Sequence, residues 1–290
     1  MTSLAEVRLT DVEAQRVNAL RYQARDLATL EADALAPNMT SLRACVADTL
    51  ATLRERVLER WRAQEHVVLR NVPASDDGST GLVLAMSVFA ALKPYRGQQI
   101  VKHFRMSPWT TALSHTLASG FFHTDINTAD IPPAATIIQC LEPDPGAPDY
   151  GQIRVTTMKA LLEALRAGRQ TSALRLLEQD SVTMVNETSP AGWRGRLIDD
   201  DTIRFHPESL IAAQRRHGTN PADLDECLNV IHETAISISA PIHLDPGELV
   251  MISNRRALHQ RGPCTVRFRE YPSDFDARKV AVLHTLGEPA

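Results

Sequence analysis

Short runs of apolar and β-branched residues, separated by turn-forming residues, constrain the fold of this chain more than any other feature. These runs lie at residues 66–72, 134–141, 153–157, 202–205, 235–239, 248–252 and 280–284. Their length and their alternating or continuous apolar character are typical of strands that face a core. We therefore expect a β-sandwich or barrel.

Helical periodicity dominates residues 1 to about 65, where Leu42, Val46, Leu50, Leu53 and Val57 recur at steps of three or four. Thr40 and Ser41 precede this pattern and can cap the helix. Further helices are expected at residues 81–92, 158–166 and 221–233. We interpret residues 1–290 as one domain, mainly β with flanking α: N-terminal helices at 1–65, then a core at 66–285 with a helical insertion at about 158–233.

The charge balance and the apolar runs exclude several classes of partner. Lys+Arg number 31 and Asp+Glu 35, a net charge of −4 without a basic stripe, so we expect no nucleic-acid partner. No apolar run approaches a membrane span, and the N-terminal residues lack the basic and apolar blocks of a secretory signal. We expect a cytoplasmic protein without membrane association. Its four scattered cysteines form no C-x-x-C pair and are expected to be reduced.

A candidate metal site begins at His123 and Asp125. Residues i and i+2 of an extended strand point to one face, so both side chains can reach a common point. A distant histidine, His259, follows a strand that the turn at Pro246-Gly247 introduces. Two histidines and one carboxylate leave a face of an octahedral metal open, as in non-haem Fe(II) oxygenases. His-x-Asp triplets also occur by chance, as a solvent-facing histidine beside a turn-forming aspartate, so the distant histidine carries much of the argument.

The two segments together resemble a known family. Phe-His-Thr-Asp at 122–125 and Pro-Gly-Glu-Leu-Val-Met-Ile-Ser-Asn-Arg-Arg-Ala-Leu-His-Gln-Arg at 246–261 are similar to signatures of the Fe(II)/2-oxoglutarate dioxygenases of the taurine dioxygenase and clavaminate synthase-like superfamily. The resemblance spans roughly residues 65 to 285. It implies a double-stranded β-helix (jelly roll) with His123, Asp125 and His259 as iron ligands. Aspartate at position 125 argues against halogenation, because related halogenases have a small residue there.

The resemblance also implies a cation for the far carboxylate of 2-oxoglutarate, and a guanidinium can bind it through two hydrogen bonds. Arg278, near the start of the last expected strand, fits best; Arg269 is the second choice, and Arg267 is a further alternative. Thr156 is a candidate for a second contact to the cosubstrate. The loop at residues 142–151 is a candidate lid. The residues expected to contact the substrate are Asn127, Arg105 and His103.

By this resemblance the chain uses Fe(II), 2-oxoglutarate and O2 to oxidise, most simply by hydroxylation, an unactivated C–H bond. The expected substrate is a small polar metabolite such as an amino acid or a natural-product intermediate, and the products include succinate and CO2. Desaturation or cyclisation at the same iron site is an alternative. Two further alternatives are a cupin-like metal-dependent isomerase or hydrolase and a non-catalytic binding protein. The sequence does not determine the oligomeric state.

Overall fold

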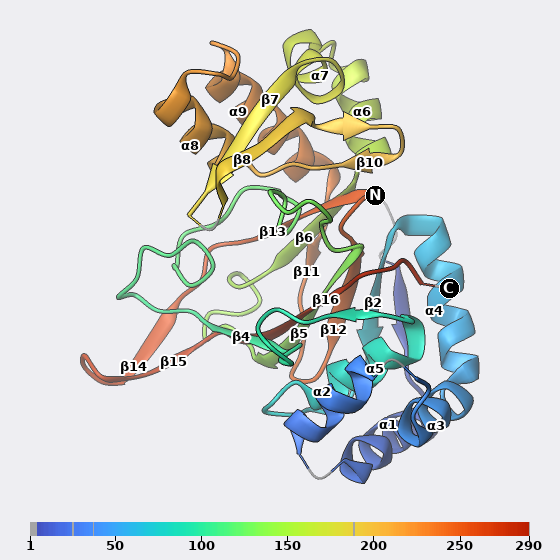
Figure 1. Cartoon of the computed structure of the whole chain (residues 1–290). Coiled ribbons are helices and arrows are strands. Elements are labelled where there is room, and N and C mark those ends of the chain that lie inside the picture. Colours follow the sequence, from blue (N-terminus) through green and yellow to red (C-terminus); the bar gives the residue numbers. More distant parts are fainter. Residues whose placement is uncertain (1–4, 25, 37, 188, 290) are drawn as a thin grey trace.

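The computed structural model describes residues 5–24, 26–36, 38–187 and 189–289 (Figure 1). Of the range 1–65 that was predicted to be helical, residues 1–4, 25 and 37 lie outside this part. The prediction is wrong at β1 (Glu6–Arg8), which pairs in parallel with β2 (His66–Arg70). This short segment buries Val7 and exposes both neighbours, an alternation that suits a strand. The helices are α1 (Asp11–Gln23), α2 (Leu27–Leu35), α3 (Ser41–Thr49), α4 (Ala51–Gln64) and, after β2, α5 (Ser79–Val88).

Side-chain caps set where these helices begin. The hydroxyl of Thr40 accepts a hydrogen bond from the backbone N–H of Arg43 at 3.1 Å, which confirms the predicted cap of α3. A reciprocal capping box between Thr10 and Glu13 begins α1. The helix predicted at 81–92 starts and ends earlier, as α5, because the chain is extended from Phe89 onward. The buried faces of these helices cover one face of the large sheet.

The large sheet has the strand order β1-β2-β12-β5-β16-β3, and β4 also pairs with β16. Its remaining strands are β3 (Leu92–Lys93), β4 (Lys102–Arg105), β5 (Ala135–Glu142), β12 (Leu249–Ser253) and β16 (Lys279–Thr285). The strands predicted at 66–72, 134–141, 248–252 and 280–284 are thus confirmed as β2, β5, β12 and β16. Alternation along β2 explains how the sheet separates two cores: Val67 and Leu69 face the helices, and Val68 faces the opposite side.

A smaller sheet faces the large one. Its order is β11-β6-β13, with β6 (Ile153–Thr157) in the centre, β11 (Pro241–Ile242) and β13 (Ala257–Arg261). The core between the sheets joins Val68, Ile138 and Val280 of the large sheet to Ile153 and Val155 of the small one. A hairpin of β14 (Val266–Glu270) and β15 (Asp274–Ala277) follows (Figure 1). The described residues therefore form a mixed α/β structure with two facing sheets.

The chain between β6 and β11 forms a lobe above the sheets (Figure 1). Its elements are α6 (Met158–Ala167), α7 (Thr171–Glu178), β7 (Ser181–Asn186), β8 (Ser189–Arg196), β9 (Ile198–Asp199), β10 (Thr202–Ile203), α8 (Pro207–His217) and α9 (Leu224–Ile238). The strand predicted at 235–239 is wrong, because α9 continues to Ile238. Ile231 and Ala235, four residues apart, are both buried on one helical face, and packing within the lobe outweighs the β-branched composition.

Two further expectations concern the membrane and the thiols. Among the described residues, no helix combines the length and the apolar character needed to cross a membrane. Cys45, Cys140, Cys227 and Cys264 are free, and the last three are buried.

Candidate metal centre and adjoining cavity

His123 and His259 are brought together by the backbone. The N–H of His123 donates to the carbonyl of His259 at 2.9 Å, and the N–H of His259 donates back to the carbonyl of His123 at 3.1 Å. This antiparallel bridge joins the segment before the lobe to β13. Side chains of directly opposed residues lie on the same face, and the two imidazole centroids are 4.5 Å apart.

Asp125 stands at the start of a turn rather than within a strand. Its backbone N–H donates to the side-chain oxygen of Asn254 at 2.7 Å, and the Asn254 amide donates back to the carbonyl of Asp125 at 3.0 Å. The next residue, Ile126, has φ of +50°, a conformation that is unusual for a β-branched residue. Asn254, which is buried, thus fixes this turn at the end of β12.

The three side chains converge on one point. Nε2 of His123 lies 3.6 Å from Oδ1 of Asp125, and Nε2 of His259 lies 3.7 Å from Oδ2. One nitrogen or oxygen atom of each residue lies within 4.8 Å of the others. Ligand atoms at right angles around a cation with bonds of about 2.1 Å are about 3 Å apart, so a modest contraction would complete a metal site.

Hydrogen bonds at the far side of His123 and Asp125 fit these two residues to a cation, whereas Nδ1 of His259 is buried without a partner among the described residues. Nδ1 of His123 lies 2.9 Å from the carbonyl of Phe121, so it carries the proton and leaves the Nε2 lone pair facing Asp125. Oδ2 of Asp125 accepts from the hydroxyl of Thr136 at 2.7 Å and lies 3.1 Å from Nε2 of His284. Thr136 and His284 are directly opposed on β5 and β16. Both strands of the large sheet therefore orient the carboxylate.

The protonation states of Asp125 and His259 also suit metal binding. Burial raises the pKa of Asp125, but the neighbouring histidines outweigh it and hold this pKa well below its usual range. Burial lowers the pKa of His259 to about 4. For His123 burial is opposed by hydrogen bonding and attraction to Asp125, and the pKa is raised. An ionised carboxylate beside a neutral His259 offers two lone-pair donors in ligand form.

A cavity of about 720 Å³ adjoins this site. Apolar side chains of both sheets, including Ile138, Ile153 and Val280, form part of its wall. Its polar lining includes Arg278, which is 5% exposed. Among the described residues none accepts a hydrogen bond from the Arg278 guanidinium or lies within ion-pair distance of it. Burial accordingly lowers its pKa.

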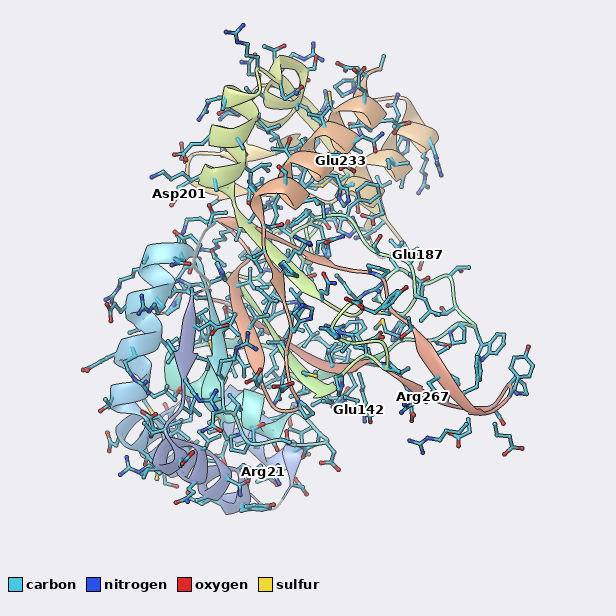
Figure 2. All side chains as sticks on the ribbon, turned by 180° about the vertical axis from the view of Figure 1, so that it is seen from behind. Arg21, Glu142, Glu187, Asp201, Glu233 and Arg267 are labelled. Carbon is cyan, nitrogen blue, oxygen red and sulfur yellow. The ribbon has the colours of Figure 1, made fainter. Side chains whose placement is uncertain are left out.

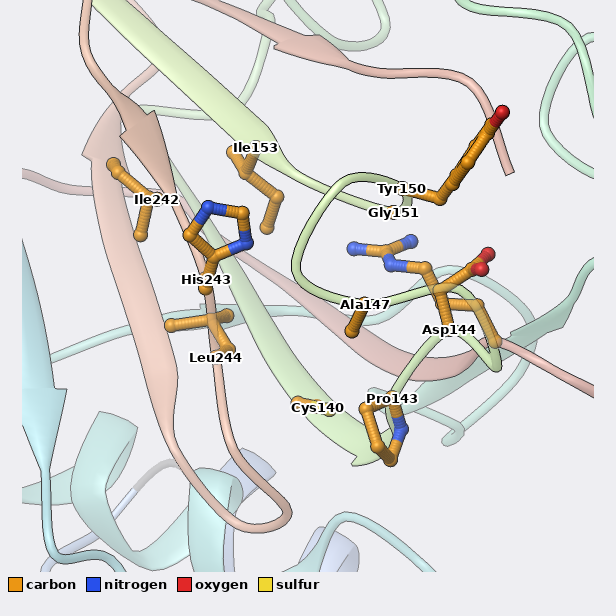
Figure 3. A pocket seen from close by; sticks show the side chains of 11 residues that line it. Cys140, Pro143, Asp144, Ala147, Tyr150, Gly151, Ile153, Ile242, His243 and Leu244 are labelled. Carbon is orange, nitrogen blue, oxygen red and sulfur yellow. The ribbon is translucent and has the colours of Figure 1, made fainter. Parts of the chain in front are cut away.

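The surroundings of Arg278 explain why it has no partner. A smaller pocket beside it is lined by Asp144 and Gly151 (Figure 3). The Asp144 carboxylate already accepts from the N–H groups of Gly146 and Thr265, each at 2.9 Å. Gly151 has φ of +71°, and a Cβ there would lie 3.0 Å from Cδ of Arg278. The loop that contains Asp144 and Gly151 therefore lies close to the Arg278 side chain without forming an ion pair with its guanidinium.

The other predicted cosubstrate residues lie elsewhere. Arg267 and Arg269 are exposed on the β14–β15 hairpin, and both pair with Asp276; Figure 2 shows Arg267 at the edge of the molecule. Thr156 is buried on β6 opposite Leu258, and it does not line the described cavity.

The three residues predicted to contact substrate also lie outside the described lining of the cavity. Asn127 is buried, and its amide donates to the sulfur of Met184 at 3.0 Å. The Arg105 guanidinium stacks 4.4 Å from the ring centroid of Phe275. His103 is exposed, with Nε2 at 3.0 Å from the carbonyl of Asp77.

Sequence reasoning missed several residues that surround the site. Asn254, Thr136 and His284 support Asp125, and His206 and Glu208 of the lobe line the cavity. Polar residues inside otherwise apolar strands were the available signal for Thr136 and His284. No local signal distinguishes His206 and Glu208, because the lobe brings them to the metal centre only through its tertiary packing.

Comparisons with known proteins agree with this geometry. Residues 35–270 match the family model described as Taurine catabolism dioxygenase TauD, TfdA family. Curated proteins gave no match.

Similar solved structures include asparagine oxygenase (AsnO), with TM-score 0.71 and 16% identity over 98% of this chain and 94% of that one. Asparagine oxygenase in complex with Fe(II), 2S,3S-3-hydroxyasparagine and succinate gives 0.70 and 16% over 97% and 94%. The non-heme iron oxygenase OrfP with Fe and alpha-ketoglutaric acid gives 0.66 and 17% over 98% and 94%. At these identities the likeness concerns the fold.

Proposed function

Because the chain belongs to the TauD, TfdA family of dioxygenases, we propose that it is an Fe(II)- and 2-oxoglutarate-dependent oxygenase. In this proposal it hydroxylates a C–H bond of a small polar metabolite such as an amino acid, with release of succinate and CO2. One observation carries the proposal. The walls of a single cavity hold both a convergent His-Asp-His set and a buried guanidinium without a partner.

His123, Asp125 and His259 are the residues that would hold the iron. Their donor set, two imidazole nitrogens and one carboxylate, suits Fe(II) and occupies one side of it. When bound, Fe(II) supplies the oxidising chemistry by activating O2 together with 2-oxoglutarate. Thr136 and His284 keep the carboxylate in place through its second oxygen.

Arg278 is the residue we assign to the far carboxylate of 2-oxoglutarate, in preference to Arg269. A guanidinium in a site of low dielectric gains most from a bidentate anion, whereas Arg269 is exposed and already paired. The apolar walls of Ile138, Val280 and Val282 would exclude water from the reaction. Thr156 is not needed in this arrangement.

The finer fold assignment is also part of the proposal. We infer that the two facing sheets are the halves of a double-stranded β-helix (jelly roll). Residues 1–290 then form one domain, with N-terminal helices and an insertion of helices and hairpins between β6 and β11. The cytoplasmic location expected from the sequence stays a prediction.

Anaerobic absorption spectroscopy with Fe(II) and 2-oxoglutarate tests the proposal, followed by an assay of succinate release with amino acids. We expect a charge-transfer band and Fe(II)-dependent succinate release. Both should be lost in His123→Ala, and both should persist in the control His217→Ala, which changes an exposed histidine of α8. Robust turnover by His123→Ala would refute the proposal. Metal binding without consumption of 2-oxoglutarate would instead indicate another metal chemistry.

A further inference from the structure

The charged residues that line the cavity leave one carboxylate without an assigned role. Among the described lining residues the acids are Asp125 and Glu208, and the bases include Lys93, Lys102 and Arg278. Asp125 belongs to the metal centre. Glu208 is therefore the carboxylate that remains available to a bound molecule.

One oxygen of Glu208 is buried and unsatisfied. Oε2 is shielded from solvent, and no described residue donates a hydrogen bond to it. Glu208 lies in the first turn of α8, where the helix dipole stabilises a negative charge. A buried carboxylate oxygen without a donor nevertheless costs free energy, which a bound donor would recover.

His206 is the group nearest to Glu208 that could supply a positive charge, with Nδ1 3.4 Å from Oε2. One observation excludes this role. Nδ1 of His206 accepts a hydrogen bond from the N–H of Ser209 at 3.3 Å, and therefore presents a lone pair rather than a proton to Glu208.

A second unsatisfied acceptor lines the same cavity. Gln260, adjacent to His259 on β13, is 4% exposed. Its Nε2 donates to the carbonyl of Gly120 at 3.0 Å, which fixes the orientation of the amide. Oε1 is thus left as an acceptor, and no described residue donates to it. Two acceptors at the wall of one cavity thus lack a donor among the described residues, and N–H groups of a bound molecule would satisfy them.

We propose that Glu208 and Gln260 form the subsite for a positively charged nitrogen of the substrate, a protonated amine or a guanidinium. The inference rests on the proposed function and specifies its substrate class. A cationic nitrogen offers several N–H donors and a charge, so it satisfies both acceptors at once. Lys93 and Lys102, on β3 and β4, supply the opposite charge elsewhere in the cavity, which suits a zwitterion. Figure 1 shows α8 in the lobe and β4 at the edge of the large sheet.

The test compares matched cationic and neutral compounds. Calorimetry under anaerobic conditions measures the binding of L-arginine against L-citrulline, and of L-lysine against L-norleucine, to the protein with Fe(II) and 2-oxoglutarate. Nα-Acetyl-L-arginine distinguishes an α-ammonium from a side-chain cation as the bound group. Succinate release with the same compounds is the second readout.

Three variants make the test specific. Glu208→Gln keeps the shape of the side chain and removes its charge, Glu208→Asp keeps the charge, and Glu226→Gln is a control at an exposed position of α9 in the same lobe. We expect the wild type to bind at least one cationic compound about tenfold or more tightly than its neutral counterpart. Glu208→Gln should abolish this preference, Glu208→Asp should retain part of it, and Glu226→Gln should retain all of it.

Two results would overturn the inference: equal binding by the wild type within every pair, with L-arginine against Nα-acetyl-L-arginine counted as a pair for the α-ammonium, or a preference that survives in Glu208→Gln. Calorimetry does not depend on turnover, so the two proposals can fail separately. Amine binding that depends on Glu208, without consumption of 2-oxoglutarate, would refute the proposed function alone. Turnover without any preference for charge would refute the substrate subsite alone.

Discussion

Replacing Arg278 by methionine should change stability and cosubstrate binding in opposite directions. Arg278 is 5% exposed, and no described residue pairs with its guanidinium. Methionine has a similar volume and no charge to desolvate. Exchange of buried charges for apolar side chains of similar size is often neutral or stabilising, by about 1–4 kcal/mol. We therefore expect Arg278→Met to unfold at the same temperature as the wild type or at a higher one.

The binding effect should be large and unfavourable. Loss of one partner of a buried, hydrogen-bonded charge pair costs about 2–5 kcal/mol. At about 1.4 kcal/mol for each factor of ten, 2-oxoglutarate should bind from roughly 30-fold to several thousand-fold more weakly. A ligand at 100 times its dissociation constant stabilises a protein by about 2.7 kcal/mol. Each kcal/mol of stabilisation raises the unfolding temperature by roughly 2–4 °C. The variant should lose most of this shift at the same concentration.

Thermal unfolding with and without 2-oxoglutarate, with Mn(II) in place of Fe(II) to prevent turnover, measures both effects. Arg269→Met is the matched control, because Arg269 is exposed and paired with Asp276. It should change the unfolding temperature little and keep the full shift with 2-oxoglutarate. A strongly destabilised Arg278→Met would contradict the absence of an internal partner, and an undiminished shift would contradict the assignment of the cosubstrate carboxylate.

Three further perturbations test other parts of the structure. Thr136→Val removes the 2.7 Å hydrogen bond to Asp125 and should weaken Co(II) binding about 10- to 100-fold in an absorption titration; unchanged affinity would refute the supporting role. Gly247→Ala places a Cβ 2.4 Å from the carbonyl oxygen of Val72, at a residue whose φ is +92°. The free energy of unfolding, measured by chemical denaturation, should therefore decrease by at least about 1–3 kcal/mol. Burial lowers the pKa of His66, so the folded protein favours the neutral ring. The free energy of unfolding is therefore highest above about pH 6.5, the pKa of an unperturbed histidine, and it decreases as the pH falls toward the lowered pKa. His66→Gln should therefore reduce the slope of unfolding free energy against pH in this range, by at most about 1.4 kcal/mol per pH unit; an identical slope in both proteins would contradict this assignment.

The main strands and most helices followed from local signals. Residues 67–69 and 249–252 are apolar and include β-branched side chains; Pro73 follows the first segment, and Pro246-Gly247 precedes the second. Such segments have few alternatives, because their composition, length and flanking turns favour the same state. Residues 235–239 failed because Ala-Ile-Ser-Ile-Ser alternates like a strand, yet packing against α6 and α7 keeps residues 235–238 in α9.

By itself, the sequence selected His123, Asp125 and His259, since two residues on one short segment and one after a distant strand matched a metal-binding pattern. Only the tertiary structure distinguished Arg278, buried at the cavity, from Arg269, exposed and paired with Asp276, and brought Glu208 and Gln260 to the cavity. Arg269 lies within β14 and Arg278 between β15 and β16, and the burial of each depends on which strands and loops pack around it. The sequence determines the chemical type of a side chain, but residues far from it in sequence determine its dielectric environment and its partners.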